Sequence, residues 1–408
     1  MTTIQVNIGP TAGVLIAVIV GIHLQYQWTF PQSITQHDKQ TPIDAVASSS
    51  VPPVQQSRTV VYTPTKTNQR HHAGNGNDAS TVPPEINERP IIGMLTQNCI
   101  GNYKTFGKQV LFPNNVKWMQ GSGAQVVPIW ADQSEEYYEK MFKQINGLYL
   151  PGGLSTSTNS TYFRSARVLL KLAIKENDRG VYFPVWGVCL GLQFFLSNIA
   201  QRDITYQCPG QMFHRTQLYK GEDFEDSFLK KILTPQSLTA LEERNFMPHM
   251  HKRCVSKKAF YSIPELQKLF KIVSINTDGD GIEYISTIES RKYPFYATQW
   301  HPEKYSYHWN VRAQTPHSSS AIKIGHEIGN FFVAESRRNN HKFVDPTDEE
   351  ALLINNYQVV VFGSPGYASY YFFQAEDITE EGLRKRKEKL VALRNMKVSM
   401  NAGDKFKK

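Results

Sequence analysis

The nine residues Val185-Trp186-Gly187-Val188-Cys189-Leu190-Gly191-Leu192-Gln193 contain the feature that decides the fold. An apolar run enters a Gly-x-Cys-x-Gly core, and apolar sequence compatible with a helix leaves it. Small residues two positions before and after a nucleophile let the backbone turn sharply between a strand and a helix, so that the central side chain stands above a sheet. The stretch predicts a nucleophile elbow with Cys189 at its tip. A buried cysteine in an ordinary strand-to-helix turn fits the same residues.

Two groups of backbone amides are candidates for an oxyanion site near Cys189. The helix expected after Cys189 directs its positive end at the sulfur, which favours thiolate, and the amide of Leu190 faces any oxyanion that develops. The turn Leu150-Pro151-Gly152-Gly153 ends another expected strand. Its consecutive glycines leave amides unshielded, so Gly153 is a second candidate donor, although Pro-Gly-Gly is also common in plain turns.

A candidate base lies about 110 residues after the elbow, in Gln299-Trp300-His301-Pro302-Glu303-Lys304. Residues two apart in an extended chain face the same side, so His301 and Glu303 can present an imidazole and a carboxylate together. A neutral imidazole near the sulfur accepts its proton, and a carboxylate on the other ring nitrogen holds the tautomer. A single histidine in a turn is usually structural, but paired with an elbow cysteine it becomes a catalytic candidate.

The elements around these motifs predict one α/β domain. Short apolar runs alternate with helical stretches, which is typical of a parallel sheet with helices on both faces. The expected strands are 90–95, 124–129, 147–150 and 182–187, and the expected helices are 110–121, 135–144 and 162–176. Three later strands, 272–276, 282–287 and 295–299, are separated by turn residues and predict an antiparallel edge. A long helix is expected over 318–339, with Ser318, Ser319 and Ser320 as capping candidates.

The ends of the chain differ in composition from this domain, which we place at 89–375. An apolar run, Ile8–Ile22, has the length of a signal-peptide core, so residues 1–30 are expected to be a signal peptide or an uncleaved anchor. Residues 31–88 are polar and rich in Ser, Pro and Gly, which predicts a disordered linker. A signal peptide or anchor implies that the protein enters the secretory pathway. The sequon Asn159-Ser160-Thr161 is compatible with glycosylation there. Membrane contact is expected only through an uncleaved anchor.

The net charge of +9 comes mainly from the last 25 residues of the tail 376–408. From Arg384 to Lys408, ten Lys/Arg oppose Glu388 and Asp404, an excess of eight. The remaining chain is therefore close to neutral, which argues against nucleic acid as a partner. The charged tail is expected to be a solvated helix or extension. Four cysteines allow at most one internal disulfide if Cys189 is a free nucleophile, with one thiol left over.

These motifs together resemble the γ-glutamyl hydrolases, within the class I glutamine amidotransferase-like superfamily. The resemblance covers about residues 88–375, and the motifs follow one another in the same order as in the family. It rests on Pro90-Ile91-Ile92-Gly93, Leu150-Pro151-Gly152-Gly153, Phe183-Pro184-Val185-Trp186-Gly187-Val188-Cys189-Leu190-Gly191, Asn276-Thr277-Asp278-Gly279, Ile285-Ser286-Thr287 and Gln299-Trp300-His301-Pro302-Glu303-Lys304.

The resemblance implies a flavodoxin-like three-layer α/β sandwich with a mostly parallel central sheet. It implies a Cys189 nucleophile, a His301 base and Glu303 as third member, with Gly152, Gln193 and His251 on the substrate side. The implied reaction cleaves γ-glutamyl bonds of folate polyglutamates through a thioester, in lysosomes or after secretion. It implies a small-molecule substrate and no metal or organic cofactor. Whether the chain forms a homodimer is left open. A glutaminase-type amidotransferase and a catalytically weakened γ-glutamyl-binding homologue are the alternatives.

Two departures from the family pattern concern specificity. The family commonly has Glu where this chain has Gln193, and the family's Tyr-Ile-Ala-Ala-Ser-Tyr-Val-Lys segment corresponds to Val110-Leu111-Phe112-Pro113-Asn114-Asn115-Val116-Lys117. A carboxylate at position 193 would form charge-assisted hydrogen bonds with substrate nitrogen atoms, worth about 1 to 2 kcal/mol more than neutral ones. From sequence alone, Gln193→Glu is therefore expected to raise kcat/KM about tenfold.

Overall fold

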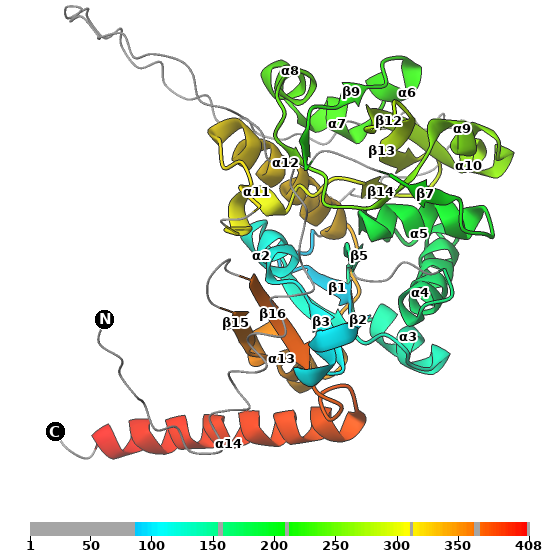
Figure 1. The fold of residues 1–408 in the computed structure, drawn as a ribbon. Helices are drawn as coiled ribbons and strands as arrows, with labels where there is room; N and C mark the ends of the chain where they lie inside the picture. The colour runs from blue at the N-terminus through cyan, green and yellow to red at the C-terminus, as the bar shows by residue number, and fades with distance from the viewer. Residues whose placement is uncertain (1–85, 154–157, 209–211, 311–312, 363–367, 406–408) are drawn as a thin grey trace, which may run out of the picture. The chain divides into compact units, whose positions relative to one another are not determined.

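An eight-stranded sheet forms the centre of the computed structural model, which describes residues 86–153, 158–208, 212–310, 313–362 and 368–405 (Figure 1). The predicted signal segment and nearly all of the predicted linker lie outside these residues. In sheet order the strands are β4 (Gln125–Ile129), β1 (Ile91–Leu95), β5 (Gly147–Leu150), β6 (Val185–Val188), β14 (Phe295–Thr298), β13 (Glu283–Ser290), β12 (Phe270–Thr277) and β9 (Gln217–Leu218).

The first five strands in this order are parallel, and the last three form an antiparallel edge. β1, β5, β6 and β14 are buried along their whole length. Helices cover both faces of these strands, so their side chains are apolar on both sides. The expected mostly parallel sheet with an antiparallel edge is thereby confirmed.

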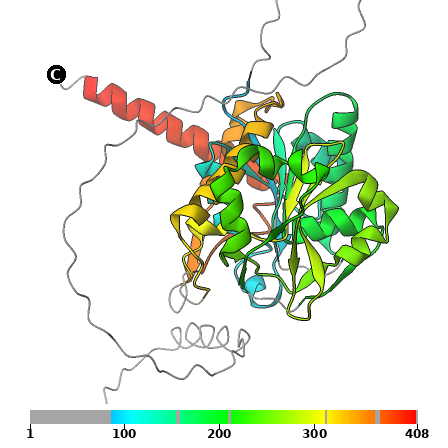
Figure 2. The ribbon, with the colours of Figure 1, turned by 90° about the horizontal axis from the view of Figure 1, so that it is seen from above.

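Helices form the outer two layers (Figure 2). Successive side chains of a strand face opposite ways: Ile91 and Leu95 of β1 belong to one apolar cluster, Ile92 and Met94 to another. The first cluster lies under α3 (Glu135–Phe142), α4 (Thr161–Asp178), α5 (Leu190–Ile199), α9 (Lys257–Tyr261) and α10 (Pro264–Leu269). The second lies under α2 (Pro113–Gly121), α7 (Phe228–Ile232), α8 (Pro235–Glu243) and α12 (Ser319–Ser336). The three-layer α/β class is confirmed.

One expected helix begins later than predicted. Residues Gln109–Leu111 are strand β3 of a second, four-stranded sheet with β2 (Gln97–Asn98), β16 (Ala368–Phe373) and β15 (Val359–Phe362). The helix α2 starts at Pro113, because proline lacks an amide hydrogen and suits the first helical position. The prediction of helix over 110–112 was therefore wrong, since the apolar residues there pack in a sheet.

Short elements connect these layers. They are η1 (Gly101–Thr105), β7 (Thr205–Gln207), β8 (Phe213–His214), α6 (Glu222–Glu225), β10 (Met247–Pro248), β11 (Arg253–Val255), α11 (Lys304–Tyr307), α13 (Pro346–Leu352) and η2 (Ile354–Asn356). A long helix, α14 (Glu380–Lys405), follows them. β7 pairs with β11, and a disulfide joins Cys208 to Cys254 beside them. Cys99 and Cys189 are free, which agrees with the expectation of at most one internal disulfide and a spare thiol. None of the helices in the described residues is long and apolar enough to cross a membrane.

Candidate active site

Cys189 lies at a sharp turn between β6 and α5. Its φ is 54° and its ψ is −97°, a conformation that non-glycine residues rarely adopt. A Cβ atom at Gly191 would lie 2.4 Å from the carbonyl oxygen of Leu150, and one at Gly187 would lie 2.9 Å from the backbone of Gly191. Glycine is therefore required at both positions, because another backbone segment lies too close for a side chain. The elbow predicted from Gly-x-Cys-x-Gly is present in the structure.

His301 reaches the same edge of the sheet through strand pairing. β14 runs parallel to β6 with Thr298 opposite Val188, and the Cys189 N–H donates to the Thr298 carbonyl at 2.6 Å. The chain then turns, and the Nδ1 atom of His301 lies 2.7 Å from the Oε1 atom of Glu303. Glu303 sits in a helical conformation at the start of α11 rather than in an extended strand, so the turn brings the two side chains together.

Gly152 marks the place where the cysteine and the histidine meet. A Cβ atom at this position would lie 2.8 Å from the His301 Cε1 atom and 3.1 Å from the Cys189 Cβ atom. Both side chains therefore border one backbone position. The Nε2 atom of His301 is buried and has no hydrogen-bond partner among the described residues. This nitrogen is available to accept the thiol proton.

The Gly152–Gly153 peptide is held by Gln97, a residue that the sequence analysis missed. The Gln97 Nε2 atom donates to the Gly152 carbonyl at 2.8 Å. In a trans peptide the N–H points opposite to the C=O, so the Gly153 N–H is directed away from Gln97. The Leu190 N–H approaches the Cys189 sulfur and lowers its pKa. The two amides predicted as oxyanion donors thus come from the two chain segments that flank Cys189.

Burial favours the neutral form of both the cysteine and the histidine. Burial raises the pKa of the Cys189 thiol to about 12, and the Glu303 charge adds to this rise. Lys304, the Leu190 N–H and Gln299 oppose it. The helix end therefore acts in the expected direction, but burial outweighs it. Burial also lowers the pKa of His301 below its usual value, against the opposing effect of Glu303. Attack on a substrate thus requires transfer of the thiol proton.

Gln193 lies behind the nucleophile and is buried. Its Nε2 atom donates to the Arg253 carbonyl at 2.8 Å and to the Gln299 Oε1 atom at 3.2 Å. The Gln299 oxygen receives this bond, and the Gln299 Nε2 atom is buried without a hydrogen-bond partner among the described residues. The Gln299 side chain contributes to lowering the pKa of the Cys189 thiol. Gln193 therefore orients Gln299, a role that only the folded contacts reveal.

His251 has a partner at each ring nitrogen. Its Nδ1 atom lies 3.4 Å from the Cys254 sulfur, and its Nε2 atom lies 3.0 Å from the Nδ1 atom of His249. The Tyr284 hydroxyl also approaches His249 Nδ1, at 3.1 Å. The Nε2 atom of His249 is buried without a partner among the described residues. His251 was predicted from the sequence, whereas no local pattern pointed to His249.

The segment that departs from the family pattern supports the histidine–carboxylate pair. The Asn114 Nδ2 atom donates to Glu303 Oε1 at 3.2 Å, and the Asn115 Oδ1 atom accepts from the Tyr149 hydroxyl at 2.7 Å. Although burial raises it, the pKa of Glu303 is lowered overall, because His301 and the Lys304 ammonium stabilise the carboxylate. The carboxylate therefore stays charged beside His301.

The chain is similar in sequence to known proteins of one family. The sequence model of the Peptidase C26 family matches residues 90–303. The "Gamma-glutamyl hydrolase" of Rattus norvegicus is 36% identical over 277 residues, which cover 68% of this chain and 87% of that protein. The protein of the same name from Homo sapiens is 34% identical over 278 residues, covering 68% and 87%. A solved glutaminase domain of Trypanosoma brucei CTPS covers 63% of this chain and 96% of its own at 14% identity, with a TM-score of 0.41.

Proposed function

We propose a mechanism from one premise: this chain belongs to the Peptidase C26 family, and it is a γ-glutamyl hydrolase. The observation that carries the mechanism is that Cys189 and His301 border the same backbone position, Gly152, and that Glu303 contacts the other side of the His301 ring. A nucleophile, an oriented base and a loop with unshielded amides are the parts that acyl transfer requires.

In the first half of the reaction, the His301 Nε2 atom takes the thiol proton as the Cys189 sulfur attacks the γ-carbonyl carbon. The oxyanion receives hydrogen bonds from the Leu190 and Gly153 amides. Glu303 stabilises the imidazolium that forms. The C–N bond then breaks, the leaving amine takes the proton from His301, and a thioester to Cys189 remains.

In the second half, water attacks the thioester carbon and gives its proton to His301. The C–S bond breaks, the γ-carboxylic acid product leaves, and the proton returns to the sulfur. Each turnover consumes one water and regenerates the neutral thiol and imidazole, which is the resting state favoured by burial of both groups.

The substrate class is inferred to be folate polyglutamates. A γ-linked glutamate chain carries one free α-carboxylate per residue, so its site needs cationic or hydrogen-bonding groups. Lys304 supplies a positive charge close enough to lower the pKa of the Cys189 thiol. We place Lys304, Gly152 and the His249–His251 pair on the substrate side, with Gln193 acting through Gln299.

The route of this protein through the secretory pathway to lysosomes or the exterior is also a proposal. The Cys208–Cys254 disulfide supports it, because such bonds form and persist in oxidising compartments. Asn159 of the sequon is exposed at the surface before α4, where a glycan has room. Residues 1–30 are proposed to direct entry.

The test is hydrolysis of pteroylpentaglutamate by the full chain, followed by chromatography of glutamate, diglutamate and the shortened folates. We expect γ-glutamyl cleavage that Cys189→Ala lowers by at least about 10⁴-fold in kcat. Hydrolysis that survives Cys189→Ala would refute the nucleophile. Release of ammonia from glutamine without cleavage of the folate would favour the amidotransferase-type alternative.

A further inference from the structure

The disulfide and a histidine form a group of potential metal ligands next to the active site. The sulfur atoms of Cys208 and Cys254 and a ring nitrogen of His251 all lie within 4.8 Å of one another. Within the described residues, this is the only such group of three or more cysteine, histidine or acidic side chains. In the oxidised protein, the bond between the two sulfur atoms leaves neither as a thiolate.

The donor set matches one class of cation. Thiolate and imidazole are the ligands that Zn²⁺ takes in proteins, in tetrahedral sites with Zn–S distances of about 2.3 Å and Zn–N distances of about 2.0 Å. A tetrahedron with these bonds separates its ligand atoms by about 3.3 to 3.8 Å. His251 Nδ1 already lies 3.4 Å from the Cys254 sulfur. Only the two sulfur atoms have to separate, which follows when their bond is cut.

A second observation comes from the other side of the His251 ring. A histidine that binds zinc through one nitrogen usually donates its other N–H to an acceptor, which fixes the tautomer. His251 Nε2 lies 3.0 Å from His249 Nδ1, so His249 is placed to accept this hydrogen and leave His251 Nδ1 unprotonated toward the sulfur atoms. The Tyr284 hydroxyl lies 3.1 Å from the same His249 nitrogen and adds a further contact to this row of side chains.

The two sulfur atoms are shielded from bulk solvent, because Cys254 is fully buried and Cys208 nearly so. No carboxylate belongs to the group, which disfavours Ca²⁺ and Mg²⁺.

We propose that reduction of the Cys208–Cys254 disulfide creates a Zn²⁺ site made of the Cys208 thiolate, the Cys254 thiolate and His251 Nδ1, with water at the fourth position. A dithiol reductant supplies two electrons and two protons and leaves as its own disulfide. Zn²⁺ then displaces the two thiol protons. The site lies outside the Cys189–His301 pair, so it does not depend on the proposed mechanism.

The experiment measures zinc bound per chain in the Cys189→Ser variant, which removes the active-site thiol as a competing ligand. The protein is reduced with a water-soluble phosphine, desalted without oxygen and titrated with Zn²⁺ against a chromophoric chelator. We expect one zinc per reduced chain and none in the oxidised chain. Co²⁺ in place of Zn²⁺ is expected to show the thiolate-to-metal absorption of a two-sulfur site.

Further substitutions in this background identify the ligands. Cys208→Ser, Cys254→Ser and His251→Gln are each expected to weaken binding by more than about tenfold, whereas Cys99→Ser leaves it unchanged. Circular dichroism reports whether each reduced protein stays folded. Absence of zinc in a reduced, folded chain overturns the proposal, and so does a reduced chain that unfolds and binds none. Binding that survives Cys208→Ser also overturns it.

Discussion

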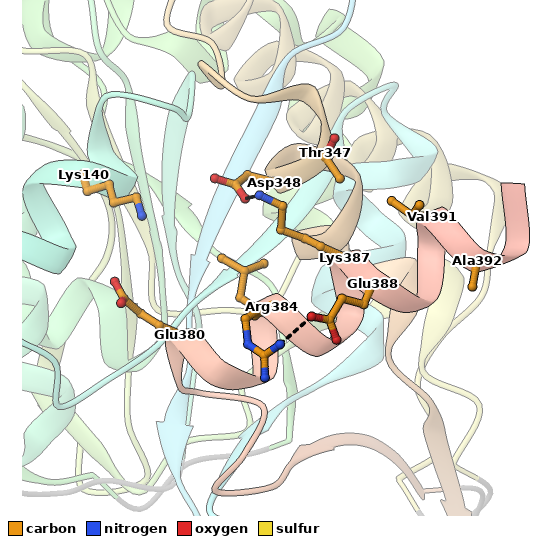
Figure 3. Close-up of a pocket in the computed structure, with 10 residues that line it drawn as sticks. Lys140, Thr347, Asp348, Glu380, Arg384, Lys387, Glu388, Val391 and Ala392 are labelled. Atoms are coloured by element: carbon orange, nitrogen blue, oxygen red, sulfur yellow. Dashed lines mark hydrogen bonds and ion pairs between the residues drawn. The ribbon is translucent and has the colours of Figure 1, made fainter. Parts of the chain in front are cut away.

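The edge of the sheet around Cys189 and the surface around α14 are held together in different ways. At the edge, the groups are closely packed: Gly152, Gly187 and Gly191 lie where a single added Cβ atom would meet another group at 2.4 to 2.9 Å. At α14, charged side chains meet across solvent. Lys387 pairs with Asp348 at 2.6 Å (Figure 3). It also pairs with Asp345 at 2.8 Å.

The packing differs accordingly. A surface cavity of about 830 Å³ opens between α14, Lys140 and α13, whereas the elbow leaves no room for a methyl group. Close-packed regions respond strongly to a change of one carbon atom, while exposed ion pairs contribute about 0 to 1 kcal/mol each. Substitutions at the edge are therefore expected to change turnover, and changes at α14 to affect stability modestly.

Gly152→Ala is expected to have the largest effect in this comparison. The new methyl group would lie 2.8 Å from His301 Cε1 and 3.1 Å from Cys189 Cβ, so the imidazole or the thiol must move. Displacement of a catalytic group by about 1 Å costs about 10²-fold in kcat. Steady-state kinetics on a γ-glutamyl substrate measures it. The control is Gly180→Ala, whose φ of 84° strains the backbone at a turn with open space around it, so that it lowers stability without displacing a catalytic group. A Gly152→Ala enzyme with wild-type kcat would show that the edge is looser than the contacts indicate.

Gln193→Glu is expected to lower kcat/KM by about tenfold, opposite to the expectation from sequence alone. A carboxylate cannot donate to the Arg253 carbonyl or to Gln299 Oε1, the two acceptors that Gln193 now serves. Gln299 is then expected to rotate and present its oxygen to the sulfur, which raises the thiol pKa further. The rate of alkylation by iodoacetamide against pH reports that pKa. Gln193→Met, which removes the donor without adding charge, separates the two effects. An increase in kcat/KM would instead support the effect expected from sequence alone, in which the carboxylate contacts the substrate.

The pH profile tests the neutral resting state of the edge. Because burial lowers the pKa of His301, its neutral, reactive form persists as the pH falls to values below the ordinary 6.5. The thiol, with a pKa of about 12, stays protonated through the neutral range. We expect kcat/KM to be flat from about pH 6.5 to pH 9 and to fall only at lower pH, as the imidazole gains a proton. An acid limb centred above pH 7 would contradict burial as the dominant cause.

Removal of the chain after Phe373 is expected to have the smallest effect on turnover. It deletes Leu383, which packs against the apolar core, together with the Lys387 ion pairs and the Arg386 contact with the Tyr357 ring. We expect kcat near the wild-type value and a Tm lower by a few degrees, since about 1 to 3 kcal/mol is a common cost for such losses.

A second truncation, after Arg394, is the matched control, because it keeps all of these contacts. Differential scanning calorimetry of the two truncated proteins compares them directly. A large fall in kcat for the first truncation would mean that the tail supports the catalytic edge, and the contrast between the two regions would fail.

The parts of the fold that sequence predicts are those encoded locally. Buried parallel strands appear as apolar runs, and the elbow needs glycines at fixed spacing, so β1, β6 and Cys189 are recognisable from neighbouring residues alone. The helix expected from Val110 failed at its start, because strand pairing of Val110 with Phe372 is a contact across the whole domain.

The same reason explains the missed site residues. Gln97 and His249 lie in the sequence far from Cys189, and each acts through a hydrogen bond whose partner only folding supplies. Gln299 lies within the quoted motif, but its orientation depends on Gln193, 106 residues away. Local pattern thus predicts the reacting groups, and long-range contacts decide how they are oriented.

The hydrogen bond from the Cys189 amide to the Thr298 carbonyl has a consequence for biosynthesis. Ribosomes add about 5 to 20 residues per second, so the nucleophile is made several seconds before the strand that brings its base. Pairing over so long a separation is slow compared with local folding. In the nascent chain, Cys189 therefore lacks its base. Hydrolytic activity is expected only when most of the domain has been translated and folded.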